Sequence, residues 1–284
     1  MAMTINTNVN SLTAQRNAIN TQSSMATSMQ RLSSGLRVNS AKDDAAGLAI
    51  AERMNTQVRG MNVAIRNAND GISLAQVAEG GLSVMSDLMQ RMRELAVQSI
   101  NSTNTSGDVA ALNQEFTQLR DEVNRTMSAV QFNGTSLFTS TASFDFQVGA
   151  NSGQTITIQG SAMNINASTG GMSGVTQGGG AASALVPATA AANSAVLVAL
   201  DTALTTLNNT RATLGAVQSR FENTINFLRT SVENQAAARG RIMDADFAAE
   251  TANLSRAQIL QQAGTAMIAQ ANQIPQGVLR LLQG

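Results

Sequence analysis

The chain contains no histidine and no cysteine among its 284 residues. Histidine is the side chain that most often serves as a general base near neutral pH, and cysteine supplies thiol nucleophiles and thiolate metal ligands. Without them the chain has no imidazole base, no HExxH zinc motif and no disulfide. We therefore expect no catalytic residue, no metal site and no cofactor site, and we predict that the protein is not an enzyme.

Proline and bulky aromatic residues are also scarce. The chain has no Trp or Tyr, eight Phe and only two Pro, but it has 14 Met and 43% hydrophobic residues. Methionine and small residues suit close helix–helix packing, and a chain with little proline can form long unbroken helices. The composition therefore favours long packed helices over a thick globular core.

An excess of either charge is missing as well. The 18 basic and 18 acidic residues cancel and are spread singly, so no basic patch predicts a nucleic-acid partner. The opening stretch, MAMTINTNVNSL, lacks the apolar core and the small-residue cleavage site of a secretory signal. The apolar-leaning run at residues 181–200 is interrupted by Ser, Thr, Asn and Pro, so we expect no membrane insertion.

Apolar residues spaced alternately three and four positions apart predict long helices in the first half of the chain. We expect one helix from Val9 to Gly35 and a second from about Asp44 to Ile100. A loop at Asn101–Asp108 leads to a third helix, which ends near residues 131–134. Asn69-Asp70-Gly71 would normally predict a turn, but the spacing continues on both sides, so we interpret it as helix.

The pattern changes in the middle of the chain. Apolar and polar residues alternate on both sides of a Gly-containing turn, which predicts a β-hairpin at residues 143–158. Residues 161–192 are rich in Gly, Ser, Ala and Thr, and we interpret them as an exposed, weakly specified tip. Another long helix begins near Asn193, and residues 239–247 join it to a terminal helix.

Both ends of the chain carry apolar or small residues at heptad spacing, the pattern of a helix that packs against another helix. At the C-terminal end these residues are Leu260, Gly264, Met267, Ala271, Ile274, Val278 and Leu281. At the N-terminal end they are Ile5, Val9, Leu12, Ile19 and Ala26, with polar Arg16 and Ser23 between them. We predict that the two seams pack on each other and that the outer faces of both helices contact other copies of the chain.

The lengths of the two longest helices predict the shape. Helices of about 46 and 57 residues would be about 70 and 85 Å long, whereas a globule of this chain length has a radius of gyration of about 19 Å. We therefore expect a mainly α, elongated rod of long antiparallel coiled-coil helices with one small β-hairpin and a Gly/Ser-rich tip. The expected segments are an inner helical domain from 1–43 and 241–284, a helical rod domain from 44–160 and 193–240, and the variable segment 161–192.

Two acidic clusters and a methionine cluster could in principle bind ligands. Asp43-Asp44 and Asp244–Asp246 could hold a hard cation. Each lies where a helix is expected to begin, and helix capping with the helix dipole already accounts for acids there. Met85, Met89 and Met92 recur at helical spacing, which is typical of a core, so we expect caps and core rather than ligands.

Six stretches of the chain are long and specific: INTNVNSL, QRLSSGLRVNSAKDDAAGLAIA, RMRELAVQSINSTN, QFNG, FQVGANSGQTITI and ANQIPQGVLRLL. With them, residues 1–158 and 193–284 resemble the bacterial flagellins, the subunits of the flagellar filament. The resemblance implies a structural subunit that assembles through paired terminal helices into the filament used as the propeller for swimming. The middle segment is much shorter than in large flagellins, which implies that large outer domains are absent or nearly so.

The resemblance also implies a location and partners. Members of the family are exported by the flagellar type III apparatus without signal cleavage, and they join the extracellular filament beneath a cap protein. The expected partners are therefore further copies of the chain in a helical filament, a cap protein, a hook–filament junction protein and an export chaperone. Host flagellin receptors are expected as well.

Two receptor-recognition sites follow from the same resemblance. The stretch that resembles the peptide sensed by the plant flagellin receptor runs from Gln30 to Ala51 and includes Asp43 and Gly47. The residues that match the positions read by the flagellin-sensing toll-like receptor are Arg91, Leu95 and Glu115. Filament packing and ordinary helix surface account for the same residues, and both interpretations can hold.

A protein of a different class would also carry such seams. A secreted coiled-coil interaction protein, such as a hook–filament junction protein or a type III effector, is the main alternative. Dilute protein mixed with filament fragments should elongate them if the chain is a flagellin, and should stay monomeric if it is the alternative.

Overall fold

The structure of this protein is a computed structural model that describes residues 7–165, 184–186 and 190–283. Within these ranges the side chains of residues 162, 190 and 274–283 are not described. Of the predicted assembly residues, Ile5 and the side chains of Ile274, Val278 and Leu281 therefore lie outside the described part of the chain.

The chain divides into two compact units. Residues 1–56 with 233–284 form one, here called the terminal unit, and residues 57–232 form the other, the central unit. The divisions fall inside the two longest helices, α2 (Ala45–Ser99) and α6 (Ala190–Met243). The predicted divisions at residues 43/44 and 240/241 lie near the ends of those helices and stay a prediction.

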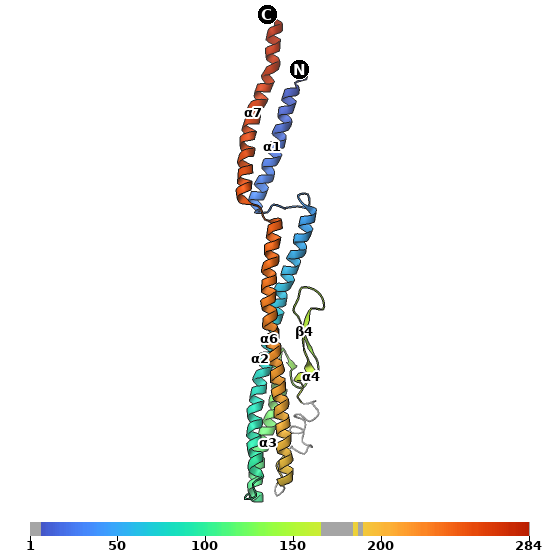
Figure 1. Ribbon diagram of the computed structural model, residues 1–284, viewed down its shortest axis with the longest axis vertical. Coiled ribbons are helices and arrows are strands. Elements are labelled where there is room, and N and C mark those ends of the chain that lie inside the picture. The colour runs from blue at the N-terminus through green and yellow to red at the C-terminus, as the bar shows by residue number, and fades with distance from the viewer. Residues whose placement is uncertain (1–6, 166–183, 187–189, 284) are drawn as a thin grey trace. The chain divides into compact units, whose positions relative to one another are not determined.

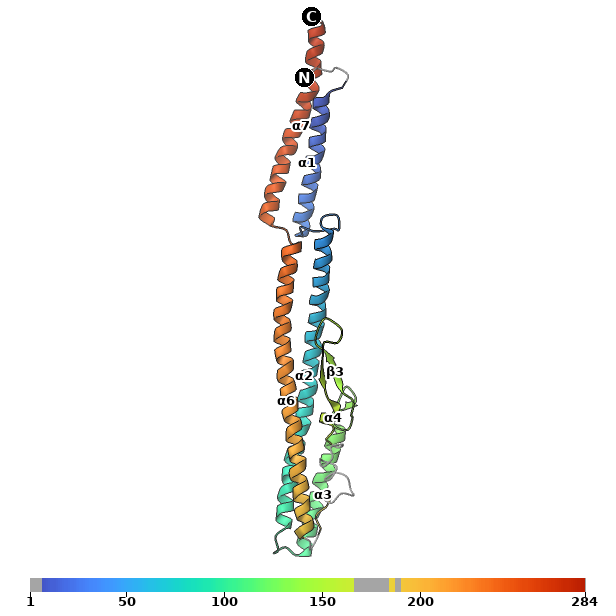
Figure 2. The same ribbon diagram turned by 45° about the vertical axis from the view of Figure 1, so that its right-hand side comes forward.

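The terminal unit contains two helices that run side by side in opposite directions, α1 (Val9–Ser34) and α7 (Phe247–Gln283) (Figures 1 and 2). Helix α1 ends at Gly35, whose φ of 71° lies in the left-handed region that favours glycine. Asp246 caps α7 by accepting a 2.9 Å hydrogen bond from the backbone N–H of Ala248. The predicted start and stop of the first helix and the capping role of Asp246 are thus confirmed.

The two connections of the terminal unit pair with each other. The backbone N–H of Arg37 donates to the carbonyl of Met243 at 2.6 Å, and the N–H of Ala245 donates to the carbonyl of Gly35 at 2.9 Å. Val38, in the first connection, is buried. Helix-stop signals locate each connection along the chain, but they do not show that the two connections bond to each other.

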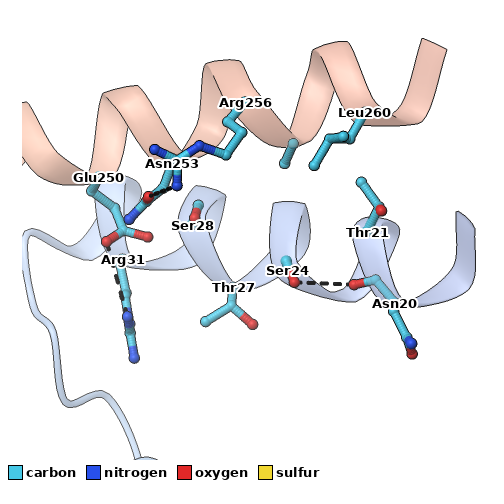
Figure 3. Close-up of a pocket in the computed structure, with 11 residues that line it drawn as sticks. Asn20, Thr21, Ser24, Thr27, Ser28, Arg31, Glu250, Asn253, Arg256 and Leu260 are labelled. Carbon is cyan, nitrogen blue, oxygen red and sulfur yellow. Dashed lines mark hydrogen bonds and ion pairs between the residues drawn. The ribbon is translucent and has the colours of Figure 1, made fainter. Parts of the chain in front are cut away.

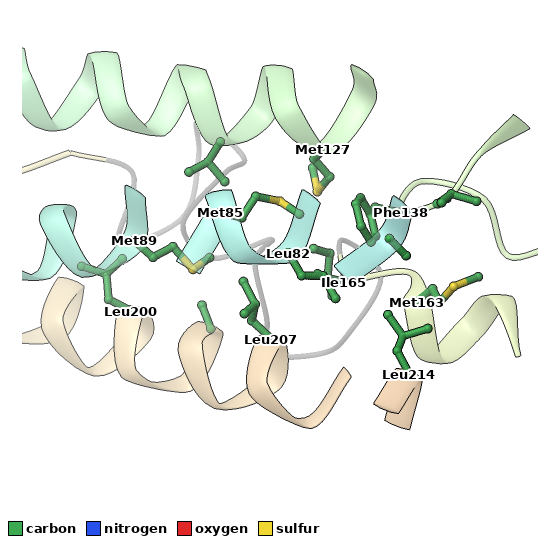
Figure 4. Close-up of a cluster of buried hydrophobic side chains, with 14 of the residues drawn as sticks. Leu82, Met85, Met89, Met127, Phe138, Met163, Ile165, Leu200, Leu207 and Leu214 are labelled. Carbon is green, nitrogen blue, oxygen red and sulfur yellow. The ribbon is translucent and has the colours of Figure 1, made fainter. Parts of the chain in front are cut away.

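The central unit is a helical bundle in which α2 and α6 run in opposite directions beside α3 (Ser106–Ala129) (Figures 1 and 2). Met85, Met89 and Met92 of α2 are fully buried. Figure 4 shows the first two of them enclosed between α3 and α6. The prediction that these methionines are core is confirmed, and so is the mainly helical fold class.

The predicted hairpin is formed by β3 (Phe144–Gln147) and β4 (Thr155–Ile158), which pair antiparallel with Phe144 opposite Ile158. Its turn lies against α2, where a Cβ added to Gly60 would stand 3.0 Å from the Cβ of Ala150. A side chain at position 60 would therefore push the hairpin away from the helix.

Gly71 has a similar role about three turns further along α2. A Cβ at this position would stand 2.6 Å from the ring of Phe221, and that ring meets Phe146 of the hairpin edge-on at a centroid distance of 5.6 Å. The Asn69-Asp70-Gly71 stretch is therefore helical, as predicted. Its glycine gives room for a buried aromatic ring rather than forming a turn.

Two small elements of the central unit were not predicted. The QFNG stretch forms a second, very short hairpin of β1 (Gln131–Phe132) and β2 (Thr135–Ser136), where a helix end alone was expected. Its turn uses positive φ angles at Asn133 and Gly134, the conformation of a type I′ turn. A single helical turn, α4 (Gly160–Met163), follows β4.

The prediction of an exposed tip at residues 161–192 falls mostly on positions outside the described residues. Where the structure does describe this segment, the prediction is partly wrong. Met163, Ile165 and Leu185 are buried in the core of the central unit. Asn113 accepts a 2.8 Å hydrogen bond from the backbone N–H of Leu185 and so holds that residue in place. The segment is rich in Gly and Ser and has no regular apolar pattern, so the burial of these three residues could not be predicted from the sequence.

Candidate interaction surface of the terminal helices

The faces by which α1 and α7 contact each other are made mainly of small and polar residues. On α1 the facing positions are Ser11, Ala14, Ala18, Thr21, Met25 and Ser28, and on α7 they are Leu254, Ala257, Gln261, Gly264, Ile268 and Ala271. Small side chains let two helices approach closely, because the distance between helix axes depends on the residues at the contact. The pair therefore buries little large apolar surface.

The predicted N-terminal seam is wrong as a contact with α7. Val9, Leu12 and Ile19 are 60, 56 and 66% exposed. These residues do have heptad spacing. The face that meets α7 has the same spacing, but each of its residues comes two positions later in the chain, beginning at Ser11. The heptad pattern is compatible with either row, and the helices pair through the row of small residues.

The predicted C-terminal seam divides between two faces. Gly264 and Ala271 lie on the face that meets α1, whereas Leu260 and Met267 are 51 and 62% exposed. The large apolar residues of the seam thus lie beside the contact and not within it. Together with the N-terminal row, they leave large apolar side chains exposed on the helix pair.

Polar contacts fix the alignment of the two helices at both ends. Near the start of α1, the amide of Asn8 donates to the carbonyl of Ala271 at 2.7 Å, and the hydroxyl of Ser11 donates to Asn272 Oδ1 at 2.8 Å. At the other end, Arg31 forms an ion pair with Glu250 at 3.9 Å. These contacts set one antiparallel alignment of α1 on α7.

The Glu250 side chain is only 10% exposed. It occupies a position on the inward face of α7, about two turns before Ala257, the first small facing residue. Arg31 Nε is also buried and has no hydrogen-bond partner within the described residues. Sequence reasoning missed this pair. The absence of any acid after Glu250 was visible in the sequence, but the inward position of that residue was not.

A groove runs along one side of the helix pair and has two stretches that share Thr21 and Leu260. The apolar stretch has a volume of about 690 Å³ and is lined from α7 mainly by Leu260, Ala263 and Met267. The polar stretch ends at Arg31 and Glu250 (Figure 3). Exposed apolar side chains gathered along one groove are typical of a surface that contacts another protein.

Two other kinds of feature, a metal-binding cluster and a membrane span, are not found among the described residues. Over the described ranges, no three His, Cys, Asp or Glu side chains converge where they could hold a metal ion. Among the helices in that same part of the chain, none has an apolar stretch long enough to span a bilayer. The helix-pair surface is therefore the candidate functional site.

The structure brings two of the three predicted toll-like receptor residues together on the surface. Arg91 forms an ion pair with Glu115 at 2.8 Å, linking α2 to α3. Hydrogen bonds to Glu94 and then to Glu115 raise the pKa of the Arg91 guanidinium. Leu95 is fully buried, so it supports this surface from beneath and is not exposed beside the other two.

The four named residues of the predicted plant-receptor stretch also include both exposed and buried residues. Gln30 and Asp43 are exposed, whereas Gly47 and Ala51 are buried. The Asp43 carboxylate accepts hydrogen bonds from the hydroxyl and the backbone N–H of Ser40, at 3.0 and 2.9 Å, and these bonds lower its pKa. Asp43 thus caps a turn, as expected.

The beginning of α2 explains the buried glycine of that stretch. Asp44 caps the helix by accepting a 2.8 Å hydrogen bond from the backbone N–H of Gly47. A Cβ at position 47 would overlap the Asp44 carboxylate. The predicted helix-capping role is therefore confirmed at Asp44, whereas Asp43 accepts its hydrogen bonds from the turn that precedes α2.

Comparison with known families and proteins gives a consistent result. Residues 5–143 match the family model for the bacterial flagellin N-terminal helical region, and residues 197–282 match that for the bacterial flagellin C-terminal helical region. A flagellin of Halalkalibacterium halodurans is 44% identical over 282 residues, covering 99% of this chain and 100% of the relative. The flagellar filament 33 kDa core protein of Treponema phagedenis is 41% identical over 292 residues, with the same coverage of 99% and 100%.

A solved structure agrees with the sequence matches. The crystal structure of Bacillus cereus flagellin superimposes with a TM-score of 0.50 at 28% sequence identity. The match covers 61% of this chain and 94% of that one. The helical architecture described above is thus found in an experimentally solved relative.

Proposed function

The chain belongs to the bacterial flagellin family, and from this we propose that it is a structural subunit of an extracellular flagellar filament that serves motility. We further propose that its copies assemble through the outward faces of the α1–α7 helix pair. Relatives named as flagellins and as a filament core protein support the structural role. We propose that the chain is not an enzyme, because a structural role needs no catalytic residue and the sequence has no His or Cys.

One observation carries the assembly proposal: the helix pair leaves several large apolar side chains exposed beside a contact made mainly of small and polar residues. The exposed residues are Val9, Leu12, Ile19, Leu260 and Met267. Fully burying one such side chain contributes about 1.5–3 kcal/mol. A neighbouring copy that covered these residues would recover that free energy. In an isolated molecule these side chains stay in contact with water and contribute no such free energy.

The same observation implies that the helix pair depends on its neighbours. Ordering α1 and α7 costs conformational entropy, and the small residues at their contact offset only part of that cost. We infer that the pair is weakly ordered in the free subunit and becomes ordered on assembly. Hydrogen exchange should then show weak protection over residues 7–40 in the monomer and strong protection in filaments. Strong protection in both states would contradict this inference.

Seeded growth tests the proposed function directly. Dilute purified protein is mixed with filament fragments, and electron microscopy with light scattering follows the length of the fragments. Elongation is the expected result. A chain that stays monomeric and leaves the fragments unchanged would instead be the secreted coiled-coil interaction protein, such as a junction protein, that is the main alternative.

Export and partners extend the proposal. We propose export without removal of a signal segment, addition beneath a cap protein, and contacts with a hook–filament junction protein and an export chaperone, because the matched motifs resemble those of flagellins. Intact mass measurement of the secreted protein tests the first point, since a cleaved signal would remove the first residues. Co-purification from an exporting cell tests the partners.

Receptor recognition is a further part of the proposal. The exposed Arg91–Glu115 pair supports recognition by the flagellin-sensing toll-like receptor, with Leu95 holding the surface from beneath. Exposed Gln30 and Asp43 support recognition of the 30–51 stretch by the plant receptor. Reporter cells should respond less to an Arg91→Ala variant than to the unsubstituted protein if the first assignment is right.

A further inference from the structure

The readily oxidised side chains of this protein are all of one kind. Peroxides attack the sulfur atoms of methionine and cysteine, and histidine, tryptophan and tyrosine are the other side chains prone to oxidation. The chain has 14 Met and none of the other four residue types. An oxidant that meets this protein therefore reacts with methionine, and the place of each methionine in the fold decides which one reacts first.

The described methionines are buried in one unit and accessible in the other. All six in the central unit are buried: Met61, Met85, Met89, Met92, Met127 and Met163. None of the five described methionines in the terminal unit is buried: Met25, Met29, Met54, Met243 and Met267. Met29 on α1 and Met267 on α7 are 54 and 62% exposed, whereas the other three are partly buried. Among the described residues, the most accessible thioethers therefore lie on the terminal helices.

Access controls the rate because the oxidant must reach the sulfur atom itself. A lone pair of the thioether sulfur attacks one oxygen of hydrogen peroxide, an S–O bond forms, and the O–O bond breaks. The departing hydroxide takes the proton of the transferred hydroxyl and leaves as water, so the sulfur loses two electrons and the peroxide gains them. A buried sulfur reacts only after the fold opens locally, which costs most free energy in core helices. Met29 and Met267 need no such opening.

We propose that Met29 and Met267 are modification sites, which oxidants of the hydroperoxide class convert to methionine sulfoxide, and that the sulfoxide at Met267 reversibly weakens binding in the groove of the helix pair. The first part depends only on the exposure of the two side chains. The second part rests on the proposed function, because it requires that another copy of the chain covers Met267.

The two sites differ in their surroundings. Met267 lines the apolar stretch of the groove together with Val9, Leu260 and Ala263, whereas Met29 lines neither stretch. Oxidation converts a flexible apolar side chain into a polar one, and covering a polar group that lacks a hydrogen-bond partner costs free energy. A partner that covered the sulfoxide of Met267 would therefore bind more weakly, and Met29 has no such effect on the groove.

The change is confined to the surface and can be undone. The described methionines of the central unit are buried, so mild oxidation leaves that unit folded. Methionine sulfoxide reductases, one for each epimer of the sulfoxide, return the side chain to the thioether. Oxidation at Met267 therefore acts on the groove alone, and reduction restores it.

Peptide mapping tests the first part of the proposal. The full-length monomer is treated with dilute hydrogen peroxide, and mass spectrometry of protease digests measures the sulfoxide at each methionine over time. We expect Met29 and Met267 to react at least about tenfold faster than Met85, Met89 and Met92, because fully buried sites react only in the open fraction of molecules. Equal rates, or faster reaction of the core methionines, would overturn the assignment of the two sites.

Seeded growth after oxidation tests the second part. Peroxide-treated protein should elongate filament fragments about tenfold more slowly than untreated protein, because an unpaired sulfoxide is costly to cover. Incubation with both sulfoxide reductases should restore the rate. The variant Met267→Leu should keep its rate after the same peroxide treatment, since leucine has a similar volume and no sulfur. The matched control is Met29→Leu, which lacks the other exposed thioether and should slow as much as the unsubstituted protein.

The outcomes separate this proposal from the proposed function. If oxidised Met267→Leu slowed as much as the oxidised unsubstituted protein, or if Met29→Leu alone were protected, the role of Met267 in the groove would be wrong and the proposed function would stand. Failure of the untreated, unsubstituted chain to elongate seeds would overturn the proposed function and, with it, the second part. The peptide map does not depend on elongation, so it decides the first part in either case.

Discussion

The central and terminal units build helix contacts from different residues. In the central unit, Leu82, Met85 and Phe221 are fully buried where three helices and a hairpin meet. In the terminal unit the contact between α1 and α7 consists largely of small and polar residues, and several large apolar residues such as Leu12, Ile19 and Met267 are exposed. The central unit thus completes its core within one chain. The terminal unit leaves large apolar side chains exposed, which we propose are covered by other copies, and the following predictions test this contrast.

The largest effect is expected from placing charge on the exposed apolar row of α7. The double variant Leu260→Asp, Met267→Asp should fail to elongate filament seeds, because two buried carboxylates would replace side chains that each contribute about 1.5–3 kcal/mol on burial. Light scattering measures elongation, and thermal unfolding of the monomer measures the central unit. The swap Leu260→Met, Met267→Leu should still elongate seeds. If the aspartate variant elongated seeds normally, the exposed apolar row would not be needed for contacts between copies. The proposed difference between the terminal and central units would then be wrong.

A large effect on folding is expected from Phe221→Ala in the central unit. The buried ring lies over Gly71 and meets Phe146 edge-on, so its removal leaves a cavity and should lower the free energy of unfolding by about 3–5 kcal/mol. Phe227→Ala is the matched control on the same helix, since Phe227 is 69% exposed and surface changes stay within about 0.5 kcal/mol. Urea denaturation followed by circular dichroism would measure both. Equal effects would show that the central core is not where the structure places it.

A smaller effect is expected from Glu250→Ala in the terminal unit. The change leaves Arg31 without its ion-pair partner, but the pair is 3.9 Å long and the Arg31 side chain is 32% exposed. We expect a loss of about 1 kcal/mol from the helix pair, which is about fivefold faster hydrogen exchange of α1 in filaments. Glu233→Ala, at an exposed acid of the same unit, should change nothing. An unchanged exchange rate in the first variant would mean that the pair does not hold the helices together.

The smallest effect is expected at acidic pH, and it should occur in both units. Hydrogen bonds from Ser40 lower the pKa of Asp43 in the terminal unit, and hydrogen bonds from Thr105 lower that of Asp108 in the central unit. A carboxylate whose pKa is lower in the folded state stabilises the fold above its unfolded pKa, about 3.9, and this stabilisation is lost as the pH falls through the folded pKa.

Substitution isolates the two carboxylates. Asp43→Asn should flatten the acid side of the pH profile of the terminal unit, measured by hydrogen exchange in filaments. Asp108→Asn should do the same for the central unit, measured by unfolding of the monomer. Each profile should respond only to the substitution in its own unit. If the variant of a unit lost stability at acidic pH as steeply as the unsubstituted protein, the substituted carboxylate would not contribute to the pH dependence of that unit.

The helices and their ends could be predicted from the sequence because their causes are local. The spacing of apolar residues gives α2 over Ala45–Ser99, close to the predicted range from Asp44 to Ile100. Asp44, Asp246 and Gly35 act at helix ends through bonds or backbone angles within a few residues. The short β1–β2 hairpin and the buried Leu185 were missed because strands of two residues and a single apolar residue leave too weak a pattern in the sequence.

The candidate site was predicted only in part. The sequence identified the helices and four large, apolar, regularly spaced residues that the structure leaves exposed, Leu12, Ile19, Leu260 and Met267, and their contact with other copies stays a prediction. It assigned them to the wrong contact, within one chain. Large apolar residues are the natural choice for a buried seam, and the sequence alone contains no reason to prefer the row of small residues beginning at Ser11.

The sequence by itself determined the lack of His and Cys chemistry, the helical periods, the caps and the hairpin, because each depends on residue type or on neighbours along the chain. Only the tertiary structure decided which face of α1 meets α7. A heptad repeat sets the spacing of a contact row, but several rows of one helix share that spacing. The choice between them came from residues more than 200 positions apart in the chain, where Asn8 and Ser11 find hydrogen-bond partners at Ala271 and Asn272, and where small side chains let the two helices come close.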